Sequence, residues 1–172
     1  YTFLAYEPDE DLDGYLASED CNDNNSTVYP GAVEIPADGL DNDCDGTVLC
    51  YADADEDGFR DSSGSTVPSL DLDCDDPGEA SASTPATDCD DSSALARPGG
   101  TELPGDGVDQ DCDGGDLCFA DYDGDGYRST SGTTVPSLDL DCSDPGEASS
   151  SDPATDCNDL NTTINPSATE VP

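Results

Sequence analysis

The sequence contains no lysine, histidine, methionine or tryptophan, and three arginines are its only basic side chains. Against them stand 43 aspartate and glutamate residues, which give a formal net charge of −40 over 172 residues. A surface this acidic repels phosphate backbones and anionic lipids, so we expect neither nucleic acid nor membrane as a partner. The sequence offers no histidine, no lysine and no apolar pocket that would tune the pKa of a catalytic group or hold a substrate, so we expect no enzyme.

Apolar residues are scarce as well. Only 25 residues are Leu, Ile, Val or Phe, too few for a hydrophobic core that offsets the entropy of ordering the chain. No stretch approaches the roughly 20 apolar residues of a membrane-spanning helix. Composition alone therefore predicts disorder, unless another kind of interaction replaces the core.

Two features can replace it, namely nine cysteines and carboxylates at fixed spacings. Many cysteines in a small acidic chain are typical of an oxidising compartment, so we expect an extracellular or cell-surface protein. No signal peptide is visible. Since the chain begins at Tyr1, we interpret it as an exported mature protein or a part of one.

The sequence repeats with a period of 68 residues, so that Cys50-Tyr51-Ala52-Asp53 matches Cys118-Phe119-Ala120-Asp121. We predict three repeats, at residues 1–49, 50–117 and 118–172. The first repeat is shorter by 24 residues between its aromatic residue and the following aspartate, because Tyr15 to Asp20 spans 5 positions and Phe59 to Asp88 spans 29. The longer segments of the other repeats, 61–87 and 129–155, are called the excursions. Because the deletion is clean, we expect the two ends of each excursion to lie close together. We expect the excursion itself to loop out from a compact core.

Proline and glycine interrupt the chain every few residues, and helical periodicity is absent. We predict a mostly irregular, loop-rich fold with a few short β-strands, arranged as an elongated array of small calcium- and disulfide-stabilised modules. Strands are expected at 66–67, at 70–72 and at their copies one repeat later. A low-complexity acidic linker is the alternative, although a linker would not keep its cysteines in register.

The most apolar segment is 1–6, and it has no counterpart in the later repeats. We expect a strand there. It either packs on the first repeat or docks on a neighbouring molecule, which would build a head-to-tail fibre.

The pattern Asp-x-Asp-x-Asp-Gly occurs five times. It is the first half of an EF-hand-type calcium loop, in which alternate carboxylates converge on one ion and glycine permits a sharp turn. In three copies, the aromatic loops, the glycine precedes an aromatic residue whose carbonyl is a predicted ligand: Asp9-Asp11-Asp13-Gly14-Tyr15, Asp53-Asp55-Asp57-Gly58-Phe59 and Asp121-Asp123-Asp125-Gly126-Tyr127. The other two, the cysteine loops, contain a cysteine: Asp41-Asp43-Asp45-Gly46 and Asp109-Asp111-Asp113-Gly114.

An EF-hand loop also needs a carboxylate at its twelfth position. Counting from Asp9 gives Asp20, whereas counting from Asp53 or Asp121 gives a glycine. Because Asp20 aligns with Asp88 and Asp156, we predict that these three closing aspartates complete the aromatic loops. Further candidate ligands are Asp23, Asp91 and Asp159 for the aromatic loops, and Glu34, Asp38, Glu102 and Asp106 for the cysteine loops.

The predicted donors are all oxygen atoms, which favours calcium over zinc or copper. Magnesium demands a small octahedron and keeps its waters, so it fits such loops less well. A single motif of this kind could be an ordinary acidic turn on a solvated surface. Five copies in register favour metal binding.

The order of these motifs resembles the MopE-type metal-binding repeat over nearly the whole chain. That order is Asp-x-Asp-x-Asp-Gly-Tyr/Phe, then Asp-Cys-Asp/Asn-Asp, then Pro-Gly with Glu-Ile/Leu, then Asp-Gly-Leu/Val-Asp-Asn/Gln-Asp-Cys-Asp-Gly. The resemblance implies a surface or secreted repeat protein, with thrombospondin type 3 repeats as a more distant analogue. Where the family usually has a cysteine before Asp-Gly, this chain has Pro36-Ala37 and Pro104-Gly105. Copper binding, known for one member type, does not carry over without histidine or methionine.

Each full repeat offers four cysteines, and the first repeat lacks the first two of them together. We therefore prefer to pair first with second and third with fourth, which gives Cys21–Cys44, Cys50–Cys74, Cys89–Cys112 and Cys118–Cys142. Cys157 is left over, and it pairs either with further chain or with a neighbouring molecule. Asn24, Asn25 and Asn161 begin Asn-x-Ser/Thr sequons and are candidate glycosylation sites, although plain solvated loops fit them equally well.

These features predict a calcium-stabilised extracellular structural repeat protein, such as a stalk, an adhesin segment or a filament subunit. Its expected partners are calcium ions, identical neighbouring subunits and glycans. The competing class is an acidic module that sequesters calcium or binds mineral. A few tight sites would favour the structural role, and many weak sites the sequestering role.

Overall fold

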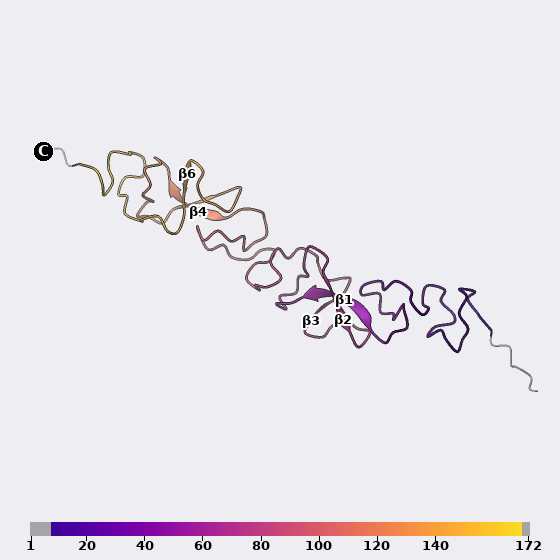
Figure 1. Ribbon diagram of the computed structural model, residues 1–172. Coiled ribbons are helices and arrows are strands. Elements are labelled where there is room, and N and C mark those ends of the chain that lie inside the picture. Colours follow the sequence, from indigo (N-terminus) through magenta and orange to yellow (C-terminus); the bar gives the residue numbers. More distant parts are fainter. Residues whose placement is uncertain (1–7, 170–172) are drawn as a thin grey trace, which may run out of the picture. The chain divides into compact units, whose positions relative to one another are not determined.

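The computed structural model describes residues 8–169. Within this range the chain forms six short strands and no helix, and the rest is loops and turns (Figure 1). The predicted loop-rich fold with a few short strands is confirmed. The strand predicted at residues 1–6 lies outside the described residues, and none of the described chain forms a helix able to cross a membrane.

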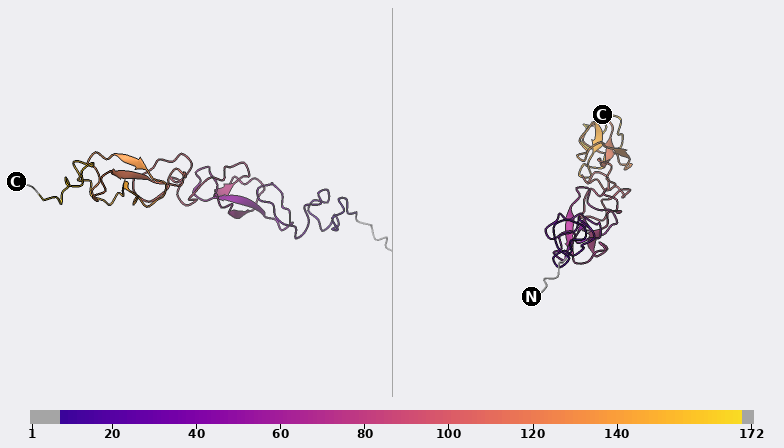
Figure 2. Two further views of the ribbon diagram at one scale, coloured as in Figure 1. Left: turned by 90° about the horizontal axis from the view of Figure 1, so that it is seen from above. Right: turned by 90° about the vertical axis from the view of Figure 1, so that its right-hand side faces the viewer.

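The chain divides into one compact unit that ends at Ala94 and a second that begins at Leu95. Each unit holds one three-stranded sheet embedded in irregular chain (Figures 1 and 2). The division falls within residues 50–117, so the compact units and the sequence repeats have different boundaries.

The sheet of the first unit has the order β2-β1-β3, with both outer strands antiparallel to the central one. The strands are β1 (Val48–Asp53), β2 (Thr66–Ser69) and β3 (Gly78–Ala80). In β1 the side chains of Val48, Cys50 and Ala52 are buried, because alternate residues of a strand share one face. Strand β1 runs directly into an aromatic loop, which begins at its last residue, Asp53.

The second unit repeats this arrangement with the order β5-β4-β6. Its strands are β4 (Leu117–Asp121), β5 (Thr134–Pro136) and β6 (Gly146–Ala148). Here too the central strand ends on the first aspartate of an aromatic loop, Asp121.

The excursions contribute the outer strands of both sheets, because β2 and β3 lie in 61–87 and β5 and β6 lie in 129–155. The ends of each excursion lie side by side, as expected, since Asp61 forms a parallel bridge with Asp88 and Ser129 forms one with Asp156. The prediction that the excursions loop out from a compact core is wrong. Their strands pair with the central strand of each sheet and so form part of the core.

The strand predicted at Leu70–Leu72 is absent, and these residues form bends. Strand β2 pairs with β1 as far as Ser69, whose partner is Val48. Before Val48 the chain belongs to a cysteine loop, so Leu70 has no strand to pair with, and its side chain is 88% exposed. The alternation of leucine and aspartate therefore does not mark a half-buried strand here. The strands predicted at 66–67 and 134–135 lie in β2 and β5.

The small core of the first unit consists of Val48, Cys50 and Cys74, with Ala37 and Val67 packed against it. The structure joins Cys50 to Cys74, Cys21 to Cys44 and Cys118 to Cys142, which is the preferred pairing. Cys89 and Cys112 are disulfide-bonded as well, and Cys157 is free and exposed. Disulfide sulfur thus supplies much of the little apolar material that is buried.

Replacing both Cys50 and Cys74 by alanine should lower the free energy of unfolding by more than the matched replacement of Cys21 and Cys44. The two bridges close loops of similar length, with sequence separations of 24 and 23, so each should lose about 3 kcal/mol of loop-closure stabilisation. Only the first pair also loses buried sulfur, because Cys50 and Cys74 are buried whereas Cys21 is exposed. Urea denaturation of both double variants measures the difference, and equal losses would contradict a role for the buried sulfur.

Candidate metal centres

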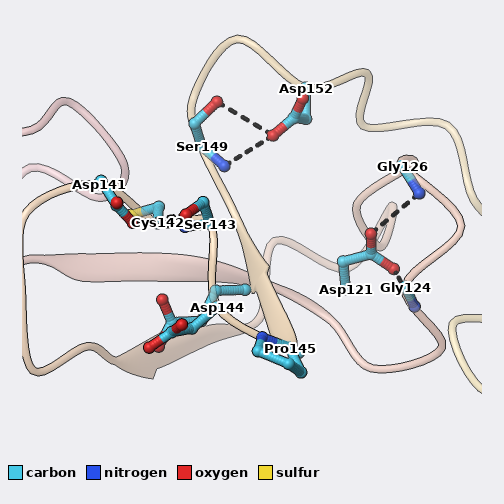
Figure 3. A pocket seen from close by; sticks show the side chains of 12 residues that line it. Asp121, Gly124, Gly126, Asp141, Cys142, Ser143, Asp144, Pro145, Ser149 and Asp152 are labelled. Carbon is cyan, nitrogen blue, oxygen red and sulfur yellow. Dashed lines mark hydrogen bonds between the residues drawn. The ribbon is translucent and has the colours of Figure 1, made fainter.

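Each aromatic loop is shaped by its first aspartate, whose carboxylate accepts backbone N–H groups from the loop itself. In the second unit, Asp121 Oδ1 accepts from Gly124 at 2.8 Å and from Asp125 at 3.2 Å, while Oδ2 accepts from Gly126 at 3.0 Å. Figure 3 shows the carboxylate of Asp121 facing the amides of Gly124 and Gly126. The glycine that ends the pattern has a positive φ of 85°, a conformation that side chains disfavour.

The other two aromatic loops fold in the same way. Asp53 Oδ2 accepts the N–H of Gly58 at 3.3 Å, and Asp9 Oδ2 accepts that of Gly14 at 3.1 Å. The ligand oxygens of Asp9, Asp11 and Asp13 lie within 4.8 Å of one another. The loop backbone thus turns three carboxylates toward one point.

The closing aspartates are the most deeply buried acidic residues of these sites. Asp20 is 8%, Asp88 1% and Asp156 0% exposed. In each, Oδ1 accepts the N–H of the residue two positions later, at 2.8–2.9 Å, whereas Oδ2 is buried without a hydrogen-bond partner. A buried carboxylate oxygen without a donor is costly, so these oxygens fit a bound cation.

Other carboxylates of the three sites also keep a buried oxygen without a hydrogen-bond partner, and they are Asp11, Asp13, Asp55 and Asp123. The aspartates three residues after the closing aspartates also contact the aromatic loops. Asp23, Asp91 and Asp159 accept the N–H of Glu10, Ala54 and Tyr122 at 3.0, 2.7 and 3.1 Å. Segments that are 37 residues apart in each full repeat therefore meet at one cluster of oxygens.

Burial, together with the crowding of like charges, raises several pKa values in these clusters. In the first unit, burial raises the pKa of Asp88 above its ordinary value of 3.8, and the charges of Asp55, Asp57 and Asp91 raise it further. The pKa values of Asp55 and Asp91 are raised for the same two reasons. Burial and neighbouring carboxylates likewise raise the pKa of Asp11, Asp123 and Asp159. The folded chain without metal therefore carries unfavourable negative charge at each site.

The aromatic residues Tyr15, Phe59 and Tyr127 were predicted to offer their carbonyl groups. Their amides donate to the third aspartate of each loop at 2.8–3.0 Å, and their side chains are partly buried. The ring of Tyr15 stacks on that of Tyr29, with centroids 5.5 Å apart. The backbone of each aromatic residue is thus held against its site, and ligation by its carbonyl stays a prediction.

In the cysteine loops the first aspartate again accepts the N–H of the terminal glycine, at 2.9 Å in both Asp41 and Asp109. Glu34 Oε1 accepts the N–H of Asp43 at 2.9 Å, and its Oε2 is buried without a hydrogen-bond partner. In the second unit Glu102 accepts three N–H groups, from Gln110, Asp111 and Leu117. Both glutamates thus contact the loops from the amino-terminal side, and their ligation of a metal stays a prediction.

Asp38 and Asp106, the other candidate ligands of the cysteine loops, lie beside buried amide side chains. Each accepts hydrogen bonds from a buried amide, Asp38 from Asn42 at 3.4 Å and Asp106 from Gln110 at 3.1 and 3.0 Å. The amide oxygens in turn accept the N–H of Ile35 and Leu103. Asn42 and Gln110 were not predicted, although they stand at equivalent repeat positions inside the cysteine loops.

Three further acidic residues keep a buried oxygen without a hydrogen-bond partner, namely Glu79 in β3, its counterpart Glu147 in β6, and Asp116. None of them belongs to a predicted site. Asp116 stands where the first unit has the buried Val48, and no pattern in the sequence marks it. Of the sequon residues, Asn24 is exposed, while Asn25 and Asn161 are half-buried and accept hydrogen bonds from Thr27 and Thr163.

The family that matches the chain is described as "Cu-binding_MopE: Putative metal-binding motif", at residues 20–48, 88–116 and 156–172. The chain contains three matches to the MopE-type metal-binding motif. Each MopE-type match begins at a closing aspartate, and the first two run on through a cysteine loop. The aromatic loops lie outside the matched residues, so each of the first two matches contributes to two different carboxylate clusters. No curated protein and no solved structure matches the chain.

The metal-free chain should become more stable to urea as the pH falls from about 7 towards 3.8, the ordinary pKa of these carboxylates. A carboxylate with a raised pKa binds its proton more tightly in the folded state, so its stabilising contribution is present at low pH and is lost as the pH rises through the raised value. Denaturation of metal-free protein across this range measures the effect. Asp91→Asn should reduce the pH dependence, and the exposed control Asp90→Asn should not. A metal-free chain that loses stability on acidification would contradict the crowding described above.

Proposed function

We propose that the aromatic loops and their closing aspartates bind calcium, and that the bound ions hold the fold together. The buried Oδ2 atoms of Asp20, Asp88 and Asp156, which lack hydrogen-bond partners, carry this proposal. Calcium takes six to eight oxygen ligands in flexible geometry. Three loop carboxylates, a closing aspartate and a loop carbonyl provide oxygens of this kind.

Calcium is favoured over copper, although copper appears in the name of the matching family. Copper and zinc sites use imidazole, thioether or thiolate ligands. This chain has no histidine or methionine, and eight of its nine cysteines are in disulfides. The remaining donors are carboxylates and carbonyls, which suit a hard cation.

The proposed role is that of an extracellular structural repeat protein, for example part of a stalk, an adhesin or a filament, and not of an enzyme. Disulfides are typical of proteins outside the reducing cytosol, and calcium is an available partner there. At free calcium 100 times above the dissociation constant, each site would add about 2.7 kcal/mol. Several sites acting together would then decide whether this core-poor chain folds.

A second candidate function is sequestration of calcium or binding to mineral, which the net charge of −40 favours. Many carboxylates lie outside the loops, for example Asp73, Asp75 and Asp76, which are exposed. Such groups would bind calcium weakly and in large number. The number and strength of the sites therefore separate the two roles.

Adding calcium to the metal-free, oxidised protein should produce a saturable change in circular dichroism and a smaller hydrodynamic radius, both reversed by EGTA. Calorimetry should give a few tight sites, since each buried cluster neutralises charge that the fold cannot disperse. If calcium changed neither the circular dichroism spectrum nor the hydrodynamic radius, the aspartate motifs would be ordinary acidic turns and the proposal would be wrong. Numerous weak sites would favour sequestration instead.

Asp88→Asn should remove or strongly weaken one tight site and leave the others intact. The substitution keeps the size of the side chain but removes a buried charged oxygen. Asp90→Asn is the matched control, because Asp90 is exposed and its carboxylate accepts only the local groups of Ser92. The same calcium stoichiometry in both variants would exclude Asp88 as a ligand.

A further inference from the structure

The closing aspartates reach their loops by two different routes. In the first site, Asp20 follows the loop directly, and its N–H donates to Leu16 O at 3.0 Å within one local turn. In the other two sites, a whole excursion separates the loop from Asp88 or Asp156. These ligands arrive only when the excursion has folded back.

Arg60, immediately after the aromatic loop that begins at Asp53, holds the returning end of the excursion. Its guanidinium lies over the ring of Tyr51 in β1, with Cζ 3.7 Å from the ring centroid. Its Nε donates to Thr84 O at 2.8 Å. The side chain therefore joins the strand that enters the loop to the segment that carries the closing aspartate.

Arg128 makes the same contacts in the second unit. Its Cζ lies 3.9 Å from the centroid of Phe119 in β4, and its Nε donates to Asp152 O at 2.7 Å. A further hydrogen bond runs from Nη2 to Ser150 O at 3.4 Å. Figure 3 shows that the carboxylate of Asp152 also accepts hydrogen bonds from the N–H and the hydroxyl of Ser149. These bonds stabilise the turn whose carbonyl groups Arg128 contacts.

The backbone of each arginine continues this attachment. Arg60 N–H donates to Pro85 O at 2.9 Å, and its carbonyl accepts the N–H of Asp88 at 3.4 Å. In the second unit the carbonyl of Arg128 accepts the N–H of Asp156 at 3.3 Å. The closing aspartate is thus placed by direct contact with the arginine. In the first repeat, which has no excursion, Leu16 stands at the equivalent position.

We propose that Arg60 and Arg128 are positioning residues that couple cation binding to docking of the excursions. A docked excursion presents its closing aspartate to the ion, and a bound ion in turn fixes the excursion, since coupling between two equilibria is reciprocal. The first site, closed by a local turn, is independent of this coupling. The inference rests on the proposed calcium function and adds a specific mechanism to it.

Limited trypsin digestion tests this coupling, because the rate of cleavage beside each arginine reports whether the excursion is docked. Trypsin cleaves after basic residues, and the only ones in the chain are Arg60, Arg97 and Arg128. Proline follows Arg97 and blocks that bond, which leaves Arg60–Asp61 and Arg128–Ser129. Both bonds lie inside disulfide-closed segments, so the fragments separate only after reduction. We expect calcium to slow cleavage of both bonds by about tenfold.

Asp88→Asn should abolish the calcium protection of Arg60–Asp61 and retain that of Arg128–Ser129, and Asp156→Asn should do the reverse. The unaffected bond in each digest controls for direct effects of calcium on the protease. If calcium binds by calorimetry but protects neither bond, or if each variant loses both protections, the coupling is wrong while the proposed function stands. If calcium does not bind, the proposed function itself fails.

The arginine is tested by Arg60→Leu, which installs the residue of the first repeat, and by Arg60→Lys, which keeps the charge. Gly58 and Gly126 amide resonances report on the two sites separately, because each N–H donates to the first aspartate of its loop. Arg60→Leu should weaken calcium binding about tenfold at the Gly58 site alone, and Arg60→Lys should restore part of it. Unchanged affinity, or equal weakening at both sites, would overturn the role of Arg60.

Discussion

The interaction on which this structure depends is the capture of backbone N–H groups by carboxylates. Asp9, Asp53 and Asp121 each take the amide of the glycine that ends the loop, and the closing aspartates take amides of their own. Such bonds satisfy backbone groups that would otherwise need helices or sheets. They also fix the direction of the remaining carboxylate oxygens, so one interaction both folds the loop and assembles the site.

The same interaction creates the main instability of the chain. Burial and mutual repulsion of the carboxylates gathered around each loop raise several pKa values, as at Asp55 and Asp88. The protein supplies few opposing charges, because it has three basic residues and two of them lie over aromatic rings. Neutralisation must then come from outside, while the disulfides restrain the chain whether or not a cation is present.

Sites with nearly the same ligands consequently differ in how they form. The first site is local, whereas the other two need strands β2 and β3, or β5 and β6, to bring the chain back. The sheet, the arginine contact and the closing aspartate of each excursion therefore depend on one another. This arrangement gives a loop-rich chain a degree of cooperativity that its small apolar core could not provide.

The sequence by itself determined the loops, because a carboxylate, the amides it accepts and the glycine with positive φ all lie within six residues. It also determined the closing aspartates, since the clean deletion in the first repeat aligned Asp20 with Asp88 and Asp156. Only the tertiary structure decided which strands pair with β1 and with β4, and that Leu70 is exposed. These depend on which distant segment lies opposite a residue, and that is set by contacts more than a dozen residues apart rather than by any local pattern.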